Sequence, residues 1–235
     1  SAGELMHRRP EKNELIMLLL SAEPDSIAVV NSARNLSLDP ASQYRVIVGD
    51  SGGLEWIDLV ERSCSTGDSP AIAGEFDGLL AAVVPASPAR LGHLKWLFAV
   101  GDPRTLSGLP ESMAEAILVK RSLPKDATGW HDIRSQSWRL AVPGMPAIEQ
   151  LVHTNYLQPL ADETDGGDML LHSVWAFIES GFSYRKASEV LFVHENTLRY
   201  RISKFEEKTS RSLFEVDTRM ELAWLNHLKL LRKSS

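Results

Sequence analysis

The sequence predicts an α+β fold, in which an α/β sandwich with an antiparallel-rich sheet is followed by an all-α segment. Strand patterns fall only between positions 44 and 133, where they are interleaved with amphipathic helical patterns. From position 147 onward, apolar residues recur at helical spacing alone. A length of 235 residues exceeds an average domain, and a hydrophobic content of 43% is ordinary for a folded chain. We therefore expect two folded parts.

The first part of the chain is predicted to be helical. Glu11–Ala22 places Leu15, Leu18 and Leu19 on one face. Pro24 suits the first turn of a second helix that extends to about Leu36. Residues 1–38 are accordingly expected to form an N-terminal helical segment.

The next part is predicted to run strand, helix, strand, strand, strand, helix, strand. The strand segments are rich in β-branched and aromatic residues, and Gly-containing stretches separate them. In chain order the predicted elements are Tyr44–Val48, Leu54–Cys64, Ser69–Ala73, Leu79–Val84, Leu94–Val100, Leu109–Leu123 and Trp130–Ile133. The loop Gly74–Gly78 is expected to join the two hairpin strands.

A helix over Ala147–Leu160 follows, with Ile148, Leu151 and Val152 predicted to face inward. Residues 161–168 are polar and contain two glycines, which is typical of a linker. The domain boundary is therefore expected at this linker, between residues 39–160 and residues 161–235.

The C-terminal part has the layout of a helix-turn-helix. A helix over Asp168–Ser180 ends at Gly181, which tolerates a left-handed cap. Ser183 is a suitable N-cap for a short helix over Tyr184–Leu191, whose Ala187, Val190 and Leu191 are expected to face inward. After a tight turn, a helix over 195–207 carries an apolar stripe of Leu198, Ile202 and Phe205. A final helix over Arg219–Leu231 carries a second stripe, which is expected to use Met220, Ala223, Trp224, Leu228 and Leu231.

The polar side of the helix over 195–207 has the composition that DNA recognition requires. Asn can bind adenine and Arg guanine in a bidentate manner, whereas Lys, Ser and helix N-termini can hold phosphates. We expect bases or the groove to be contacted by Asn196, Thr197, Arg199 and Tyr200, and phosphates by Ser183, Arg185, Lys186, His194 and Lys204. Glu195 and Ser203 complete the predicted DNA-facing set, whereas Arg201 leans toward the apolar flank.

This stretch resembles a known domain. The residues that carry the resemblance are Val193, His194, Asn196, Thr197, Leu198, Arg199, Tyr200 and Arg201. They reproduce the V-H-x-N-T-L-R-Y-R hallmark of the C-terminal DNA-binding domain of PucR/CdaR-family bacterial transcription regulators. Glu195 departs from the basic residue common in the variable slot, and Ser210 replaces a usual glycine. The resemblance implies double-stranded DNA as partner, a homodimer or higher homo-oligomer, and an upstream domain that senses a small-molecule effector.

Residues 40–135 resemble, more weakly, the GGDEF-like central domain of the same regulators. The local marker is the run from Val100 to Ala116, a Gly-containing segment that leads into an Ala-containing helix. A diguanylate cyclase needs a Gly-Gly-Asp/Glu-Glu-Phe hairpin whose adjacent carboxylates hold metal ions. This chain reads Ala73-Gly-Glu-Phe-Asp-Gly-Leu79, so Glu75 stands alone before Phe76. We therefore expect a degenerate domain without catalytic residues, metal or cofactor.

Charge is divided unevenly along the chain. Residues 1–182 contain 14 Lys and Arg against 24 Asp and Glu, a net charge of −10, whereas residues 183–235 contain 11 against 7, a net charge of +4. Positive charge concentrated in one segment is expected of a DNA-binding module on an acidic carrier. The surplus is modest, which favours a dimer.

Other classes of protein find little support. The single Cys64, the absence of a long apolar run and the absence of a signal-peptide pattern favour a cytoplasmic protein that does not enter the membrane. Seven scattered His residues offer no metal-site spacing. Two alternatives to a transcription regulator stay open. One is a nucleotide-binding or cyclase-like enzyme of the GGDEF type, and the other is an interaction or dimerisation module that does not touch DNA.

Overall fold

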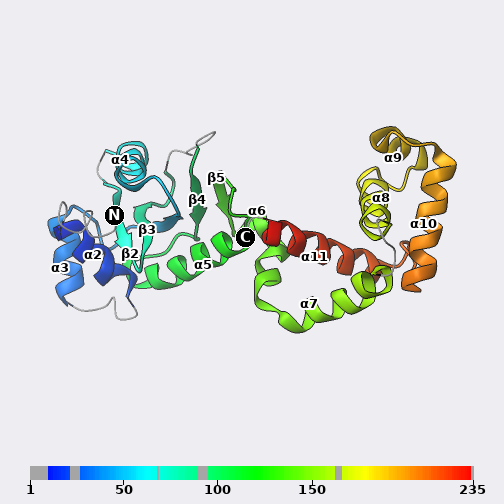
Figure 1. Ribbon diagram of the computed structural model, residues 1–235. Coiled ribbons are helices and arrows are strands. Elements are labelled where there is room, and N and C mark those ends of the chain that lie inside the picture. The colour runs from blue at the N-terminus through cyan, green and yellow to red at the C-terminus, as the bar shows by residue number, and fades with distance from the viewer. Residues whose placement is uncertain (1–9, 22–26, 68, 89–94, 162–165, 234–235) are drawn as a thin grey trace. The chain divides into compact units, whose positions relative to one another are not determined.

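The computed structural model describes residues 10–21, 27–67, 69–88, 95–161 and 166–233, and it contains two compact units. One unit comprises positions 1–143 and 231–235, and the other comprises Gly144–Leu230 (Figure 1). The expected ends at Ala22, Pro24 and Leu94, and residues 162–165 of the expected linker, lie outside the described residues.

The first unit is built on a five-stranded mixed sheet in the order β2-β3-β1-β4-β5. Its strands are β1 Tyr44–Gly49, β2 Ile72–Phe76, β3 Leu79–Pro85, β4 Leu97–Val100 and β5 Gly129–Asp132. The β2–β3, β3–β1 and β1–β4 pairs are antiparallel, whereas β4 and β5 are parallel. The predicted α+β class and the antiparallel-rich sheet are confirmed.

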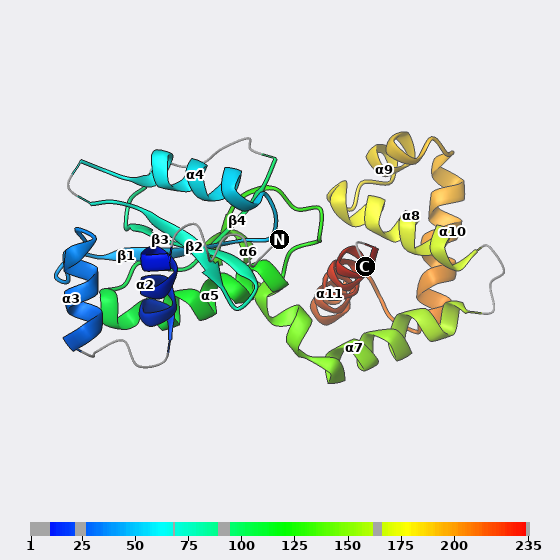
Figure 2. The ribbon, with the colours of Figure 1, turned by 60° about the vertical axis from the view of Figure 1, so that its left-hand side comes forward.

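Helices cover both faces of this sheet (Figure 2). The helices of the first unit are α2 Pro10–Leu20, α3 Ile27–Asn35, α4 Gly53–Cys64, α5 Leu109–Arg121 and α6 Ile133–Gln136, with 3-10 segments at η1 Leu106–Gly108 and η2 Ser137–Gly144. Val46 and Val48 pack against α2, α3 and α5, whereas the intervening Ile47 packs against α4. Alternation along β1 thus gives each helical layer its own core.

The core under α4 contains Trp56 and the single cysteine. Trp56 is fully buried, stacks on Phe98 at 5.9 Å and donates its indole N–H to the Leu97 carbonyl oxygen. Cys64 is also fully buried, and burial raises the pKa of its thiol to about 11. Cys64 therefore belongs to the hydrophobic core of this layer.

Close packing of α5 depends on Gly101, directly after β4. A Cβ atom at Gly101 would lie 2.0 Å from the carbonyl oxygen of Ser112 on α5. The Ser112 hydroxyl in turn accepts a hydrogen bond from the backbone N–H of Val46 at 3.0 Å. A residue without a side chain therefore allows α5 to contact β1 and β4 directly.

The hairpin between β2 and β3 corrects one prediction. The expected loop over 74–78 was too long, because Gly74, Glu75 and Phe76 pair with Ala81, Leu80 and Leu79 within the ladder. The turn consists of Asp77 and Gly78, which have φ values of 48° and 76°. Positive φ at both positions describes the two-residue Asp-Gly turn that fits the twist of a hairpin. Ser69, expected in the strand, lies in an isolated bridge with Thr66.

Two further strand boundaries differ from prediction. Lys95 and Trp96, expected in β4, form a bend before it. Ile133 begins α6 rather than ending β5, because the Asp132 carboxylate accepts the backbone N–H of Ser135 and caps that helix.

The second unit is helical throughout its secondary structure. Its α-helices are α7 Pro146–Val152, α8 Gly167–Glu179, α9 Tyr184–Leu191, α10 Glu195–Thr209 and α11 Val216–Lys233, the last of which belongs to this unit as far as Leu230. The helix predicted over 147–160 changes its hydrogen bonding along its length, from α7 into a π-helical turn, η3 His153–Leu157, and a 3-10 turn, η4 Gln158–Leu160. Val152 is buried as predicted, but Leu151 is 44% exposed.

A buried polar contact joins η3 to α11. The Tyr156 hydroxyl donates to the Glu221 carboxylate at 2.6 Å, and the Asn155 amide donates to the same oxygen. Burial and this carboxylate raise the pKa of the Tyr156 phenol. Tyr156 also stacks on Phe205 of α10 at 6.2 Å, so α10 and α11 share one anchor. The predicted inward stripe of α11 was partly wrong, since Met220 is 67% exposed and Leu222 and Leu225 are buried instead.

Candidate nucleic-acid interface

Helices α8, α9 and α10 form the predicted helix-turn-helix arrangement. After α8, Gly181 has φ 68° and Phe182 has φ 62°, and the Phe182 N–H donates to the Phe177 carbonyl oxygen. This left-handed cap reverses the chain. Phe177 then contacts the rings of Phe182 and Tyr184 at 5.5 and 4.4 Å. An aromatic cluster therefore fixes the start of α9 against α8.

The start of α9 is capped as expected. The Ser183 hydroxyl accepts the backbone N–H of Lys186 at 3.3 Å. Arg185 and Lys186 are exposed in the first turn of α9. The positive end of this helix and two exposed cationic side chains thus face solvent together, which is the composition of a phosphate-binding position.

The packing of α9 on its neighbours depends on Ala187, which is fully buried. A small side chain at this position lets the helices approach, as predicted. Val190, however, is 65% exposed, so the expectation that it faces inward was wrong. Leu191 is half-buried.

The turn between α9 and α10 presents a residue that the sequence reasoning missed. Phe192 caps α9 in the left-handed region, with φ 54° and ψ 42°, and its side chain is 95% exposed. The Phe192 and Val193 N–H groups donate to carbonyl oxygens of α9, at Glu189 and Ser188. The available signal was that a three-residue connection between two helices has no room to bury a large ring.

Helix α10 begins at a histidine cap. His194 Nδ1 accepts the backbone N–H of Asn196 at 3.2 Å, so the imidazole ring caps the N-terminus of α10. The predicted apolar stripe is confirmed, since Leu198, Ile202 and Phe205 are all at most 2% exposed. The helix extends to Thr209, two residues beyond the expected end.

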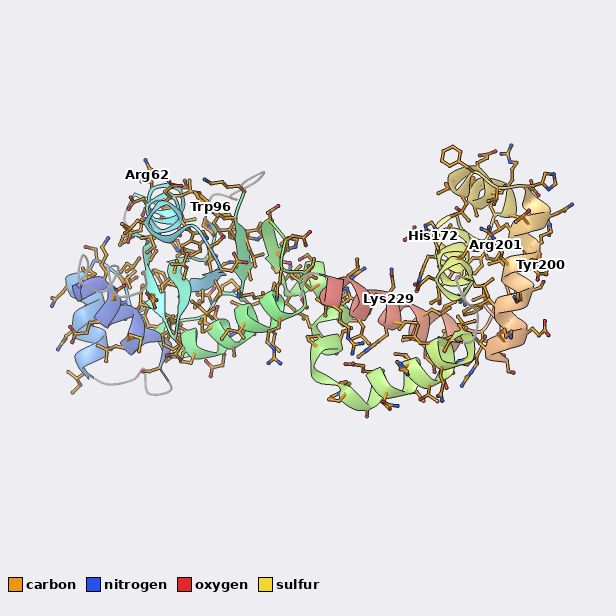
Figure 3. The ribbon with its side chains drawn as sticks, in the orientation of Figure 1. Arg62, Trp96, His172, Tyr200, Arg201 and Lys229 are labelled. Carbon is orange, nitrogen blue, oxygen red and sulfur yellow. The ribbon has the colours of Figure 1, made fainter. Side chains whose placement is uncertain are left out.

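The outward side of α10 carries most of the predicted DNA-facing residues. The exposed members are Asn196, Thr197, Arg199, Tyr200 and Ser203, whereas Glu195 and Lys204 are half-buried. Figure 3 shows Tyr200, 64% exposed, on the side of α10 away from α8. Arg201 lies toward α8, where Nη1 donates to the Ser173 hydroxyl at 3.4 Å, in keeping with its expected place on the apolar flank.

Arg199 has a second relationship that the sequence did not predict. Its guanidinium lies over the ring of Tyr184 with 4.0 Å to the ring centroid, and Nη2 lies 3.7 Å from Glu195 Oε2. Its side chain nevertheless remains 54% exposed. Arg199 is thereby held between α9 and α10 with part of its guanidinium available to solvent.

The described residues contain no cluster of three or more His, Cys, Asp or Glu able to hold a metal ion. Nor do they include a helix long and apolar enough to cross a membrane.

Comparison with known proteins identifies this helical arrangement. Residues 170–226 match the PucR C-terminal helix-turn-helix domain. The chain is 33% identical over 70 residues to the purine catabolism regulatory protein of Bacillus subtilis, a match that covers 30% of this chain and 13% of that protein. It is 35% identical over 60 residues to an uncharacterized protein of Mycobacterium tuberculosis and another of Mycobacterium bovis, matches that cover 26% of this chain and 14% of each of those proteins. A solved regulator of polyketide synthase expression from Bifidobacterium adolescentis aligns over 95% of this chain and 92% of its own, with 18% identity and a TM-score of 0.40.

Proposed function

Because residues 170–226 form a PucR C-terminal helix-turn-helix domain, we propose that this chain is part of a sequence-specific DNA-binding transcription regulator in which α10 enters the major groove. The observation that supports this most is the division of α10 into two sides. Leu198, Ile202 and Phe205 are buried, whereas Asn196, Thr197 and Tyr200 are presented to solvent. The polar side is thus available to base edges without cost to the core.

Within this proposal, the residues have distinct roles. Asn196, Thr197, Arg199 and Tyr200 contact bases or the groove, with Glu195 and Ser203 beside them. Ser183, Arg185, Lys186, His194 and Lys204 contact phosphates. His194 does so with the ring nitrogen that is not used in capping, since Nδ1 already accepts the Asn196 N–H.

Phe192 extends the same surface. It lies two residues before the His194 cap, and it is 95% exposed near the start of the proposed recognition helix. An exposed aromatic ring at this position can contact thymine methyl groups or sugars, and DNA binding would remove it from water.

The proposed regulator acts as a homodimer or higher homo-oligomer. Residues 183–235 carry a net charge of only +4, so one copy neutralises few phosphates. Two copies on related half-sites roughly 10 base pairs apart would double the contacts. The matched segment spans only 13% of the Bacillus subtilis protein. We propose in addition that an upstream domain of the regulator senses a small-molecule effector.

Binding to the DNA that flanks the gene tests the proposal. Fluorescence anisotropy with that duplex should give saturable binding that weakens steeply as salt rises from about 50 to 200 mM, because counterions are released. Asn196→Ala should weaken binding to this duplex and leave the thermal transition unchanged. An affinity that does not respond to salt would instead favour the alternative of an interaction module that does not touch DNA.

We also infer that the first unit is a degenerate, non-catalytic GGDEF-like domain. Glu75 and Phe76 lie in β2, paired with Leu80 and Leu79, and the turn that follows holds the single carboxylate of Asp77. Adjacent carboxylates for two metal ions are not present in this segment. Incubation with GTP or ATP and Mg²⁺ should give no turnover, and a cyclic dinucleotide product would support the enzyme alternative.

A further inference from the structure

A pocket of about 380 Å³ lies in the first unit, far along the chain from the helix-turn-helix residues. Its lining comes from segments that are distant in sequence: Arg45 on β1, Asp102 and Arg104 after β4, Trp130 and Asp132 on β5, and Arg134 on α6. This volume is in the range of small-molecule sites.

The pocket lies where the parallel strands β4 and β5 end. The chain leaves β4 at Val100, crosses through α5 and returns along β5 to Asp132, and both strand ends contribute lining residues. The carboxyl ends of parallel strands are the usual location of ligands in open α/β sheets. This end of the sheet is separate from the Asp77-Gly78 turn, which joins the opposite ends of β2 and β3.

Three arginines line the pocket, but they are not equivalent. Arg104 is engaged, since Nη2 lies 2.6 Å from the Glu115 carboxylate and Nη1 donates to the Pro103 carbonyl oxygen. Arg45 donates Nε to the Ala86 carbonyl oxygen, which orients the side chain and leaves its terminal nitrogens for another acceptor. Arg134 is exposed and makes no ion pair with the described residues.

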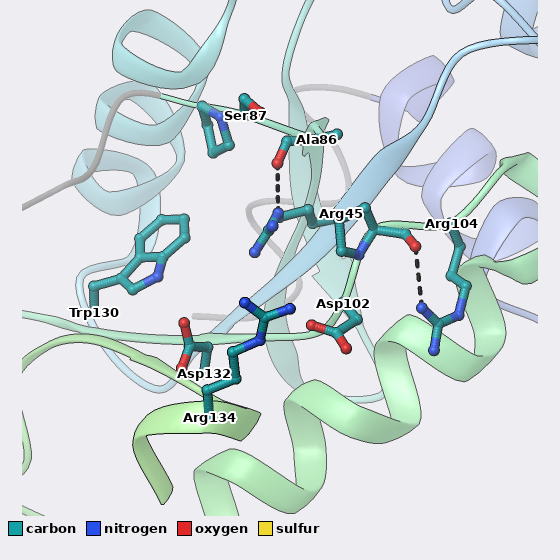
Figure 4. A pocket seen from close by; sticks show the side chains of 10 residues that line it. Arg45, Ala86, Ser87, Asp102, Arg104, Trp130, Asp132 and Arg134 are labelled. Carbon is teal, nitrogen blue, oxygen red and sulfur yellow. Dashed lines mark hydrogen bonds between the residues drawn. The ribbon is translucent and has the colours of Figure 1, made fainter.

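Arg45 and Arg134 extend their guanidinium groups into the same space, between Trp130 and Asp102 (Figure 4). Two guanidinium groups directed at one point suit an oxyanion, because each can donate two parallel hydrogen bonds to phosphate or carboxylate oxygens. The half-buried indole of Trp130 offers an apolar surface beside them. A planar ring could stack on that surface.

The carboxylates of the lining add a further requirement. Asp132 is used in capping α6, whereas Asp102 donates only its backbone N–H to Glu115 and directs its carboxylate to the pocket. A purely anionic ligand would be repelled by Asp102. A ligand that combines an anionic group with N–H or O–H donors would satisfy both kinds of charge.

We infer that this pocket binds a small organic anion built on a planar ring, with its phosphate or carboxylate held by Arg45 and Arg134. The ring lies against Trp130, and an N–H or O–H group of the ligand donates to Asp102. The site is a ligand-binding position within the first unit and does not depend on DNA binding by the second.

Isothermal titration calorimetry on the whole chain tests this inference with matched compounds. AMP carries a phosphate and an exocyclic amino group that can donate, and orotate carries a carboxylate and ring N–H groups. Adenosine lacks the anion, and ribose 5-phosphate lacks the planar ring. We expect AMP or orotate to bind with a Kd below about 1 mM, and adenosine and ribose 5-phosphate to bind about tenfold more weakly. A preference for AMP over orotate, or the reverse, shows which of the two compounds fits the pocket better.

Variants locate the binding. Arg134→Ala should weaken, by about tenfold, the affinity for the compound that binds. Arg134→Lys should lose less affinity, because lysine keeps the positive charge but not the planar guanidinium. Arg134 is exposed, so neither change should affect folding. Arg62→Ala is the control, since Arg62 is an exposed cation of α4 outside the pocket (Figure 3). Binding by neither AMP nor orotate, or binding that survives Arg134→Ala, would overturn the assignment.

Discussion

The guanidinium of Arg199 on α10 stacks over the ring of Tyr184 on α9, with 4.0 Å between the charged carbon and the ring centroid. Arg199 is also a proposed base-reading residue, so one side chain both joins the two helices and faces solvent. Stacking restricts the rotamers of a long side chain before DNA arrives. The entropy that must be lost on binding is therefore reduced in advance.

Arg199→Lys separates geometry from charge. Lysine keeps the positive charge but has no planar group to stack on Tyr184 or to bind a guanine in a bidentate manner. We expect specific DNA affinity to fall about tenfold while the dependence of affinity on salt stays the same. Anisotropy titrations at several salt concentrations measure both quantities. The matched control is Arg185→Lys, an exposed proposed phosphate contact that should change affinity little; an equal loss in both variants would argue against base reading by Arg199.

Phe192→Asn tests the exposed ring in the turn. Asn tolerates the left-handed backbone of this position, where φ is 54°, so stability should stay the same or rise by about 0.5 kcal/mol. DNA affinity should fall, because the apolar contact is lost. Thermal unfolding and anisotropy check the two halves of this prediction. Val190→Ala, at an exposed position on α9, should leave affinity unchanged. If Phe192→Asn bound DNA as tightly as the unaltered chain, the ring would lie outside the interface.

Ser210→Gly should stabilise the second unit. Ser210 follows α10 with φ 52° and ψ 34°, a conformation that costs a residue with a Cβ atom but not glycine. The expected gain in the free energy of unfolding is about 0.5–1 kcal/mol, measured by urea denaturation. Ser210→Ala retains the Cβ atom and should give no gain. A loss of stability in Ser210→Gly would show that the serine side chain contributes more than its backbone strain costs.

Gly101→Ala should destabilise the first unit. The new Cβ atom would lie 2.0 Å from the Ser112 carbonyl oxygen, so α5 would have to move away from β4. We expect the free energy of unfolding to fall by more than about 2 kcal/mol. Urea denaturation monitored by tryptophan fluorescence, to which the buried Trp56 contributes, measures this loss. Gly67→Ala is the control, since no atom lies within 4 Å of its added Cβ position. Equal stability of the two variants would contradict the packing described for α5.

The features that could be predicted from the sequence are those that a regular period controls. The buried side of α10 follows from Leu198, Ile202 and Phe205 because their spacing repeats over fifteen residues of helix. Helix α9 has only eight residues, too few for the period to determine whether Val190 faces the core. The Asp77-Gly78 turn was available in the sequence as a hairpin signal, but the neighbouring Gly74 obscured it.

The pocket in the first unit could not be predicted in this way. Its residues come from β1, β5, α6 and the segment after β4, and only the strand order brings Arg45 and Arg134 to one space. The contact between Arg199 and Tyr184 was hidden for a similar reason, because it depends on the angle between two short helices. Both features arise from tertiary packing and leave no periodic trace.

The central claim is that the exposed side of α10 reads DNA sequence. Selection from a pool of random-sequence duplexes, followed by sequencing of the bound fraction, tests it most directly. We predict enrichment of one motif with two related half-sites roughly 10 base pairs apart, and loss of preference at defined base pairs in Asn196→Ala. A bound fraction with the same base composition at every position as the starting pool would contradict the claim.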